Sequence, residues 1–281
     1  MASELLITTN GFKGTWSAIE YGAWLAETLR MKITLLGVTE NLSPAAIDDH
    51  HPLEDVFERA VGLFQQKDVE YSLEVQNGDA EQVIPRKAQA GDYVTVIGPL
   101  GRPQIRRWLI GRSIRHFMET ISRPILYVPQ SCLPLNKLLL CMGGLGYELE
   151  SENLGLKIAM ESRANVTLLH IVPPVDLDYP TARVASEQWQ DLIHTDTMLG
   201  RNLRNALEVV EAAGMHADVQ VRRGNVVEEI TSELKKGGYD LLCMGSPFSG
   251  NALRQLYSPN VTAEVAEAAV CPVLTARHKR D

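Results

Sequence analysis

Three glycines after an apolar run in the first half of the chain form the pattern with the clearest chemical potential. Gly98 and Gly101 follow the run Val94–Ile97, and Gly111 comes ten positions after Gly101. Glycines at a strand end let the backbone approach an anion, and a glycine opening a helix leaves free N–H groups at its N-terminus. The spacing therefore indicates a polyphosphate site, although ordinary turn glycines give the same pattern.

Other reactive residue types lack the partners that catalysis or metal binding needs. The run 48–51 reads Asp-Asp-His-His, but four adjacent residues cannot all turn toward one ion, so a solvated loop is the expected alternative. Ser246 and Ser249 lie in a glycine-containing segment that is not a nucleophile elbow. His170 ends an apolar run and is expected to be a hydrogen-bonded core residue. We expect no catalytic residue and no metal site.

Arginines are concentrated in the same region as the glycines. The stretch from Gly98 to Arg123 contains six of them with only Glu119 opposing, on a chain of net charge −8. Such a basic stretch indicates either a surface for phosphates or an acidic partner, or a solvated loop and helix face paired with acids of the same chain.

Apolar runs and helical patterns alternate around these glycines. Buried strands are predicted at 5–9, 33–38, 71–75, 94–97 and 125–128. Helices are predicted at 16–29, 53–66, 81–90 and 114–120, and the last begins at residue 112 if Gly111 opens it. Alternating strands and helices predict a doubly wound parallel sheet of five strands, because parallel strands require helical crossovers. Ligands of such sheets bind beyond the carboxyl ends of the strands, where the strand order reverses.

The second half of the chain repeats the first. Four pairs of apolar segments match in the same order, with an offset that grows from 133 to 148 positions: Leu5–Gly11 with Leu138–Gly144, Ile33–Val38 with Val166–Ile171, Val94–Gly98 with Leu241–Gly245, and Pro124–Val128 with Pro272–Ala276. The growing offset predicts an insertion in the second copy, between Pro173 and a helix expected at 192–212. We predict two domains, residues 1–130 and 137–281, joined near Pro129 and Pro134.

Composition fits two ordinary domains and excludes several protein classes. The 281 residues are 45% hydrophobic and 22% charged, which is typical of globular proteins. The net charge of −8 argues against nucleic-acid binding. The four cysteines lie apart in apolar runs and are expected to be free thiols. No membrane-spanning run and no signal peptide are visible, so we expect a cytoplasmic protein without nucleic-acid or membrane partners.

The glycine pattern, taken with its surroundings, resembles a known family. Gly-x2-Gly-x9-Gly after the fourth strand of an alternating α/β domain is similar to the ATP-binding motif of the universal stress proteins. Leu5–Gly11 resembles the family's first strand and its Asp-Gly turn, and Gln76–Asp79 resembles its turn before the third helix. Arg123–Val128 and Cys271–Leu274 resemble its final strand in each copy. The resemblance covers nearly the whole chain twice and implies a tandem universal stress protein of the Rossmann-like, adenine nucleotide alpha hydrolase-like class.

The resemblance implies an adenine nucleotide, ATP or ADP or AMP, with or without Mg²⁺, in the first copy. It assigns the nucleotide contacts to Asn10, Gly11, Val38, Gly98, Gly101, Gly111, Arg112 and Ser113. Asn10 replaces the family's Asp, which keeps hydrogen-bonding capacity but removes the charge. Arg112 stands where the family has Ser or Thr, with Ser113 one residue later, so Arg112 either contacts phosphate or fills its place.

The second copy departs further from the motif. Gly143 replaces the Asp, and Pro259 and Asn260 replace the Gly-Ser/Thr pair, so its nucleotide site is expected to be degenerate. The first hypothesis is therefore a stress-response protein that senses adenine nucleotide in domain 1 and acts on an unknown protein partner, without being an enzyme. The alternatives are a nucleotide-free interaction scaffold or a protein for another small ligand, and, more weakly, a slow ATPase. By analogy the two copies form an intramolecular pseudo-dimer through their last strands, and a homodimer is a further option.

Overall fold

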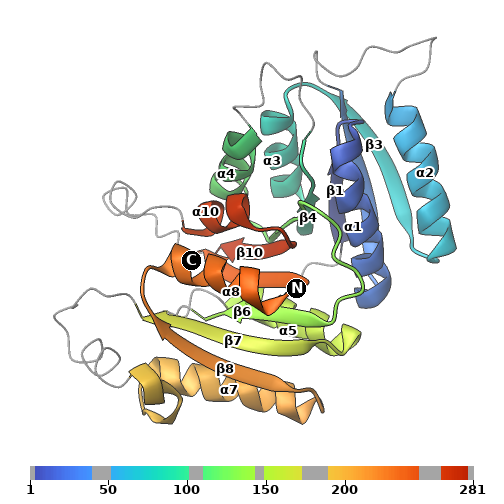
Figure 1. Cartoon of the computed structure of the whole chain (residues 1–281). Helices are drawn as coiled ribbons and strands as arrows, with labels where there is room; N and C mark the ends of the chain where they lie inside the picture. The colour runs from blue at the N-terminus through green and yellow to red at the C-terminus, as the bar shows by residue number, and fades with distance from the viewer. Residues whose placement is uncertain are drawn as a thin grey trace. The chain divides into compact units, whose positions relative to one another are not determined.

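The carboxyl ends of the strands determine where a ligand could bind in a doubly wound fold. A computed structural model describes residues 4–39, 52–100, 110–142, 149–172, 189–246 and 261–277 (Figure 1). The chain divides into unit 1, made of Met1–Leu133 with Val270–Val273, and unit 2, made of Pro134–Ala269 with Leu274–Asp281. The domain bounds predicted from the sequence, 1–130 and 137–281, remain untested. Within the described ranges no helix is long and apolar enough to cross a membrane.

Unit 1 is a doubly wound α/β sandwich, as predicted. In chain order its elements are β1 (Glu4–Thr9), η1 (Lys13–Thr15), α1 (Trp16–Leu29), β2 (Lys32–Thr39), α2 (Pro52–Gln66), β3 (Tyr71–Asn77), α3 (Ala80–Ala90), β4 (Tyr93–Ile97), α4 (Ile110–Thr120) and β5 (Ile125–Tyr127). The strand order is β3-β2-β1-β4-β5, and every neighbouring pair is parallel.

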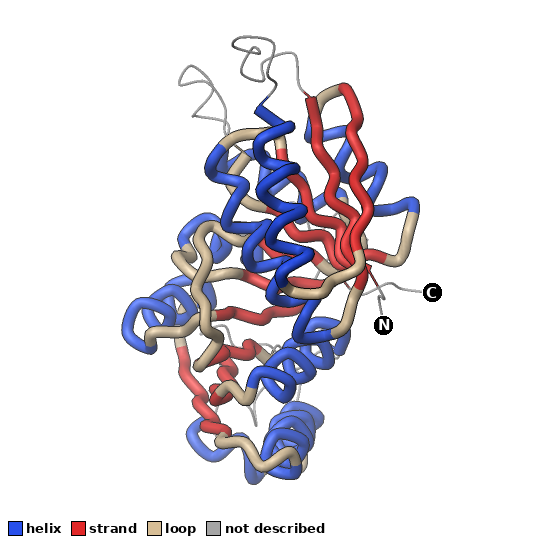
Figure 2. The backbone as a smooth tube through the Cα atoms, turned by 90° about the vertical axis from the view of Figure 1, so that its right-hand side faces the viewer, coloured by secondary structure: helices blue, strands red, loops and turns tan. Residues whose placement is uncertain are grey.

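The central strands are mostly apolar because helices cover both faces of the sheet. Leu5, Leu6 and Ile7 of β1 are all fully buried, as an all-parallel sheet requires. Helices α1 and α2 contact each other on one face, and α3 and α4 contact each other on the other (Figures 1 and 2). This arrangement follows from right-handed crossovers that run outward from β1 in one direction and from β4 in the other.

Unit 2 repeats this architecture. Its elements are β6 (Lys137–Cys141), α5 (Leu149–Ser162), β7 (Asn165–Val172), η3 (Trp189–His194), α7 (Met198–Ala212), β8 (Ala217–Arg223), α8 (Val226–Gly237), β9 (Leu241–Ser246), α10 (Val261–Ala268) and β10 (Val273–Arg277). The strand order is β10-β9-β6-β7-β8, with β9, β6, β7 and β8 parallel to their neighbours.

The two units share backbone details that the sequence comparison did not reveal. Arg30 and Arg163, which are 133 positions apart, both adopt the left-handed conformation after their helices, with φ of 55°. Gly78 N–H donates to Thr39 O at 3.1 Å, and Gly224 N–H donates to Val172 O at 3.1 Å. These matched turns confirm the internal repeat at the level of individual hydrogen bonds.

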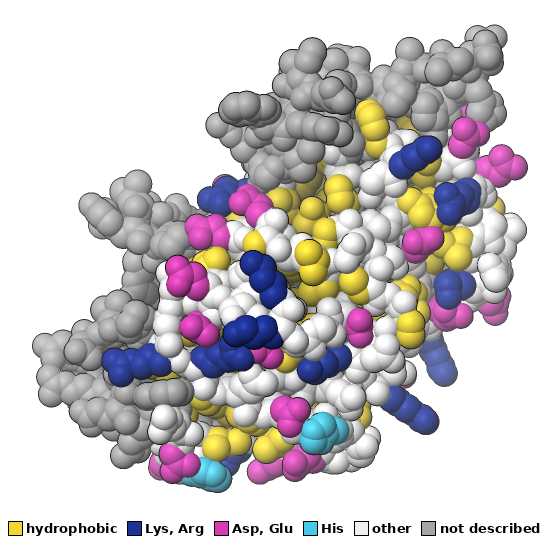
Figure 3. Space-filling view, in the orientation of Figure 1, with side chains coloured by type: hydrophobic (Ala, Val, Ile, Leu, Met, Phe, Trp, Pro, Cys, Tyr) yellow, Lys and Arg dark blue, Asp and Glu magenta, His cyan; other side chains and the backbone are white. Residues whose placement is uncertain are grey.

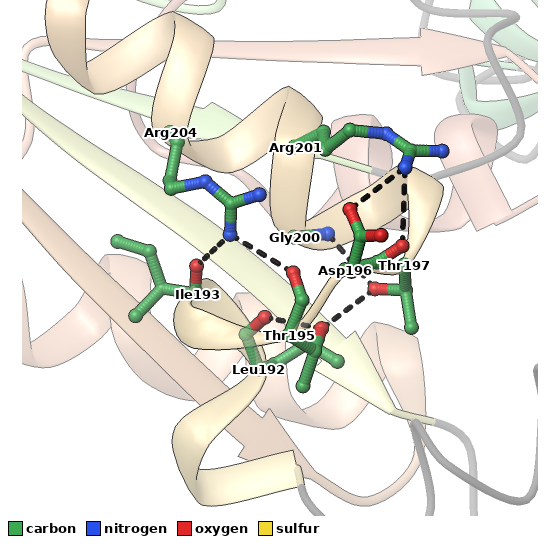
Figure 4. A network of polar contacts seen from close by, with 8 residues as sticks. All are labelled: Leu192, Ile193, Thr195, Asp196, Thr197, Gly200, Arg201 and Arg204. Atoms are coloured by element: carbon green, nitrogen blue, oxygen red, sulfur yellow. Dashed lines mark hydrogen bonds and ion pairs between the residues drawn. The ribbon is translucent and has the colours of Figure 1, made fainter.

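The start of helix α7 in the second copy differs from the prediction. A continuous helix was predicted over 192–212, but a separate 3-10 turn, η3, precedes α7, which begins at Met198. Thr197 caps α7 by accepting from Gly200 N–H at 3.0 Å, and Arg204 donates to Thr195 O at 2.9 Å and to Ile193 O (Figure 4). The helix is interrupted at Thr197 because the Thr197 hydroxyl, rather than a backbone carbonyl, accepts this hydrogen bond of the first turn of α7.

Candidate functional site

The reversal of strand order in unit 1 lies between β1 and β4. Thr9 is level with Gly37 of β2, and Thr8 is level with Ile97 of β4. Asn10, Val38 and Gly98 therefore occupy the carboxyl edges of three adjacent strands, β1, β2 and β4. The structure thus brings three of the predicted site residues to the place where doubly wound folds bind ligands.

The turn after β1 is tied together by threonines. The hydroxyls of Thr9 and Thr15 lie 2.6 Å apart, and the Thr15 hydroxyl also donates to Phe12 O at 2.7 Å. Gly11 adopts a φ of 82°, in the left-handed region that glycine tolerates, and its N–H donates to the Thr9 hydroxyl at 3.2 Å. The turn is therefore held in one conformation, and Asn10, at 1% exposure, is buried within it.

Two glycines let the turn after β1 contact the end of β4. A Cβ atom on Gly98 would lie 3.0 Å from Thr15 Cα and 3.2 Å from Gly14 O, and one on Gly14 would lie 2.9 Å from Pro99 O. A Cβ atom on either glycine would therefore require the neighbouring backbone to shift. Packing alone thus explains Gly98, which the sequence analysis assigned to a phosphate loop. Gly14 was missed, because a glycine inside a turn signals its packing role only when its neighbour is known.

The remaining predicted residues lie on or before α4. Gly101 lies outside the described residues. Helix α4 begins at Ile110, earlier than predicted, so Gly111, Arg112 and Ser113 all belong to its first turn, although their side chains are outside the description. The backbone N–H groups of a first helical turn have no partners within the helix and favour an anion. His116 fixes this helix to α3, since its Nε2 lies 3.1 Å from Glu81 O.

An apolar pocket lies beside the end of β4. Its walls come from the end of β4, from α4 and from the last residue of β5, namely Ile97, Gly98, Pro99, Leu100, Ile114, Phe117 and Tyr127. The space inside this lining is about 10 Å³, which is no larger than one water molecule needs, so it is a packing gap rather than a ligand site.

The same edge of unit 2 has a different chemistry. His170 stands at the position of Gly37, and its Nδ1–H donates to Met142 O at 2.6 Å. Burial lowers the pKa of His170, and the hydrogen bond to Met142 opposes this only in part. His170 is 7% exposed, which confirms the prediction of a hydrogen-bonded core histidine. Residues 143–148 and 247–260, including Gly143, Pro259 and Asn260, lie outside the described residues.

The cysteines are free thiols, as predicted. Burial raises the pKa of the Cys141 thiol to about 12, and the negative charge of Glu233 adds to this effect. A thiol with such a pKa stays protonated at neutral pH and is a poor nucleophile. Cys243 and Cys271 are also buried, whereas Cys132 is partly exposed.

Comparison with known proteins identifies the family. The family model described as the universal stress protein family matches residues 137–277, which is half of the chain. The chain belongs to the universal stress protein family. The matched residues are those of the predicted second copy, whose nucleotide motif was expected to be degenerate.

Full-length relatives cover both halves of this universal stress protein. Universal stress protein Slr1230 from Synechocystis sp. is 22% identical over 306 aligned positions, which cover 98% of this chain and 99% of the relative. A universal stress protein from Archaeoglobus fulgidus has a TM-score of 0.68 at 15% identity and covers 99% of this chain and 100% of its own. A putative one from Pseudomonas aeruginosa UCBPP-PA14 has a TM-score of 0.68 at 11% identity, covering 98% and 93%. These likenesses support a tandem of two family domains.

Proposed function

We propose that unit 1 binds an adenine nucleotide at the carboxyl edges of β1, β2 and β4. In this proposal the protein is a cytoplasmic sensor that transmits nucleotide binding to a protein partner during stress, without acting as an enzyme. The observation that carries it is the convergence of Asn10, Val38 and Gly98 on the point where the strand order reverses. The family membership raises the expectation but assigns no ligand by itself.

The residues present fit a nucleotide in two respects. Val38 is fully buried and offers an apolar wall with a backbone edge for a base, level with Asn10. The first turn of α4 contains Gly111, and backbone N–H groups at a helix N-terminus have no partner within the helix and favour phosphate. When bound, the nucleotide would supply the phosphate charge that these groups stabilise, and Mg²⁺ would neutralise part of that charge. No acid–base pair is assigned, so slow ATP hydrolysis is the weaker alternative.

The direct test is the identity and affinity of the ligand. Mass analysis of the small molecules released from the denatured protein should show an adenine nucleotide, and calorimetry with ATP should show saturable heat. Gly101→Trp should abolish the heat by filling the phosphate loop. Gly250→Trp in the second copy is the matched control and should leave the titration unchanged. Absence of nucleotide and of heat at millimolar ATP would exclude the proposal, and equal titrations of both variants would move the site elsewhere.

Arg112 decides between two forms of this site. If its guanidinium contacts phosphate, Arg112→Ser should weaken ATP binding despite restoring the residue type usual in the family. If the side chain occupies the phosphate position, the same substitution should create or strengthen binding. Calorimetry on this one variant separates the two.

A nucleotide-free interaction protein is the second candidate. The close backbone contacts of Gly14 and Gly98 explain the first motif glycine without a ligand, and the gap beside β4 is too small to hold one. This candidate predicts no heat with ATP and no adenine nucleotide among the released small molecules. An ATP titration that saturates would exclude it.

A further inference from the structure

The edge strand of unit 1 directs half of its backbone groups away from the sheet. Strand β3 is the first in the strand order of the described residues. Ile33 N–H donates to Glu70 O at 2.9 Å and Gly78 N–H donates to Thr39 O at 3.1 Å, so even-numbered residues of β3 direct their backbone groups toward β2. Because backbone groups alternate along a strand, the odd-numbered residues of β3 direct theirs outward, away from β2.

The same odd-numbered residues present apolar side chains. Leu73 is 42% exposed and Val75 is 57% exposed. The segment Tyr71–Asn77 contains no proline, lysine or arginine, and its one charge, Glu74, is paired with Lys87 of α3 at 2.6 Å. Figure 3 shows hydrophobic side chains gathered over β3 and α2, on the right of the view. A long apolar edge of this kind is a template for pairing with another strand.

The matching edge strand of unit 2 is protected. Strand β8 carries Asp218, Arg222 and Arg223, and η3 packs against it. Arg204 fixes η3 through the carbonyl oxygens of Ile193 and Thr195 (Figure 4). None of the β8 residues is among the exposed large hydrophobic residues. Charges and a covering segment are the usual protections of an edge strand, and the described part of unit 1 shows neither on β3.

We propose that β3 pairs antiparallel with β3 of a second copy of this chain across a two-fold axis. An isologous contact requires a strand that is complementary to itself. In the register that places Leu73 opposite Leu73 of the second copy, Tyr71 faces Val75 and Ser72 faces Glu74, so apolar residues meet and no like charges face each other. A shift that centres on Glu74 places two carboxylates opposite each other, which is unfavourable. Strand β3 neighbours β2, whose Val38 belongs to the proposed nucleotide site and lies level with Gln76 of β3. The pairing uses only the outer edge of β3, so ATP titration and sedimentation test the two proposals separately.

The oligomeric state tests the surface. Sedimentation velocity over a range of concentrations should show a monomer–dimer equilibrium, and Val75→Lys should abolish the dimer by placing a charge on the edge. Val209→Lys is the matched control, because Val209 of α7 is 46% exposed and lies in unit 2; it should leave the equilibrium unchanged. Circular dichroism establishes that both variants are folded. A monomer at every concentration would overturn the proposal. So would a dimer that Val75→Lys leaves unaffected.

Cysteine cross-linking tests the register. The background is Cys132→Ser, because the other three cysteines are buried. Hydrogen-bonded antiparallel pairs hold their Cα atoms about 5.5 Å apart, within the range of a disulfide. Leu73→Cys should therefore give a covalent dimer on mild oxidation, while Glu74→Cys and Val75→Cys should not. Preferential cross-linking of Glu74→Cys or Val75→Cys, or of none of the three, would overturn the proposed pairing.

Discussion

Lys87 of α3 pairs with Glu74 of the edge strand β3 in unit 1, and Glu233 of α8 pairs with Arg222 of the edge strand β8 in unit 2. The two ion pairs link equivalent elements with opposite polarity. Lys87 and Glu74 remain 19% and 35% exposed, whereas Glu233 is 4% exposed and also accepts from the Tyr239 hydroxyl at 2.6 Å. Burial, followed by this hydrogen bond, raises the pKa of Tyr239 to about 12.

The comparison teaches that the repeat preserves backbone geometry and apolar packing while its polar interactions diverge. Gly22 of α1 and Gly155 of α5 are 133 positions apart, and in both units a Cβ atom there would meet a strand side chain within 3 Å. In contrast, Gly37 leaves room for Phe57, whereas His170 fills the same position in unit 2. Four predictions probe this divergence, in decreasing order of expected effect.

Removing the buried carboxylate should have the largest effect. Glu233→Ala removes the hydrogen bonds that Arg222 and the Tyr239 hydroxyl donate to a buried carboxylate, while Arg222 keeps Glu229 at 3.6 Å. Losing two hydrogen bonds to a charged group should lower the free energy of unfolding by about 3 kcal/mol. Lys87→Ala removes the equivalent exposed pair and should cost under about 1 kcal/mol. Chemical denaturation measures the loss, and hydrogen exchange assigns it to unit 2. Equal losses in the two variants would contradict the difference drawn between the pairs.

Adding a methyl group between the switch-point loops of unit 1 should have the next effect. Gly98→Ala places Cβ against Thr15 Cα and Gly14 O and should destabilise unit 1 by about 2 kcal/mol. Gly62→Ala is the control, because a Cβ atom there meets nothing within 4 Å and helix propensity should stabilise by about 0.5–1 kcal/mol. Thermal unfolding measures both. If Gly98→Ala proves neutral, the close packing is not what requires glycine.

The helix caps before α3 and α8 should contribute similar, smaller amounts. Asp79 accepts from Glu81 N–H at 2.9 Å, and Asn225 accepts from Val227 N–H at 3.0 Å and Glu228 N–H at 3.3 Å. Replacing either by alanine should cost about 1 kcal/mol. Hydrogen exchange of the first turn of each helix reports the loss, and a cost confined to one unit would show that the caps are not equivalent.

The pH dependence of unit 2 should give the smallest effect. Burial lowers the pKa of His170 below its ordinary value of 6.5, so its neutral form is favoured in the folded state. This stabilisation is fully present above pH 6.5 and is lost as the pH falls toward the lower pKa of the folded state. His170→Gln should therefore flatten the decline in stability on acidification, measured by urea denaturation. His194→Gln, which alters an exposed residue of η3, should retain the wild-type decline.

The sequence was sufficient for the fold because its signals are local. Apolar runs placed the five strands of unit 1 to within two residues of the structure. The repeat then placed four of the five strands of unit 2, and no bounds were predicted for β8. The start of α4 at Ile110 was missed because Gly111 was expected to open the helix, although Ile110 continues the helical spacing of Ile114 and Phe117. The break between η3 and α7 was missed because it depends on Thr197 and Arg204 reaching backbone groups, which spacing does not reveal.

The candidate site was predictable only in part. The sequence placed Asn10, Val38 and Gly98 at the ends of three strands, and the parallel order then brought them together. It could not distinguish a phosphate-loop glycine from a packing glycine, because both roles require only the absence of a side chain. Gly101 lies outside the described residues, and its role stays a prediction.

By itself the sequence determined the tandem repeat, the parallel α/β class and the family, since each depends on residue order and local periodicity. Only the tertiary structure decided that Gly98 lies against Gly14 and Thr15, that His170 is satisfied by Met142, and that β3 leaves Leu73 and Val75 exposed. These facts depend on which segments distant in sequence come into contact. A glycine, a histidine or an apolar strand gains its role from its neighbours in space.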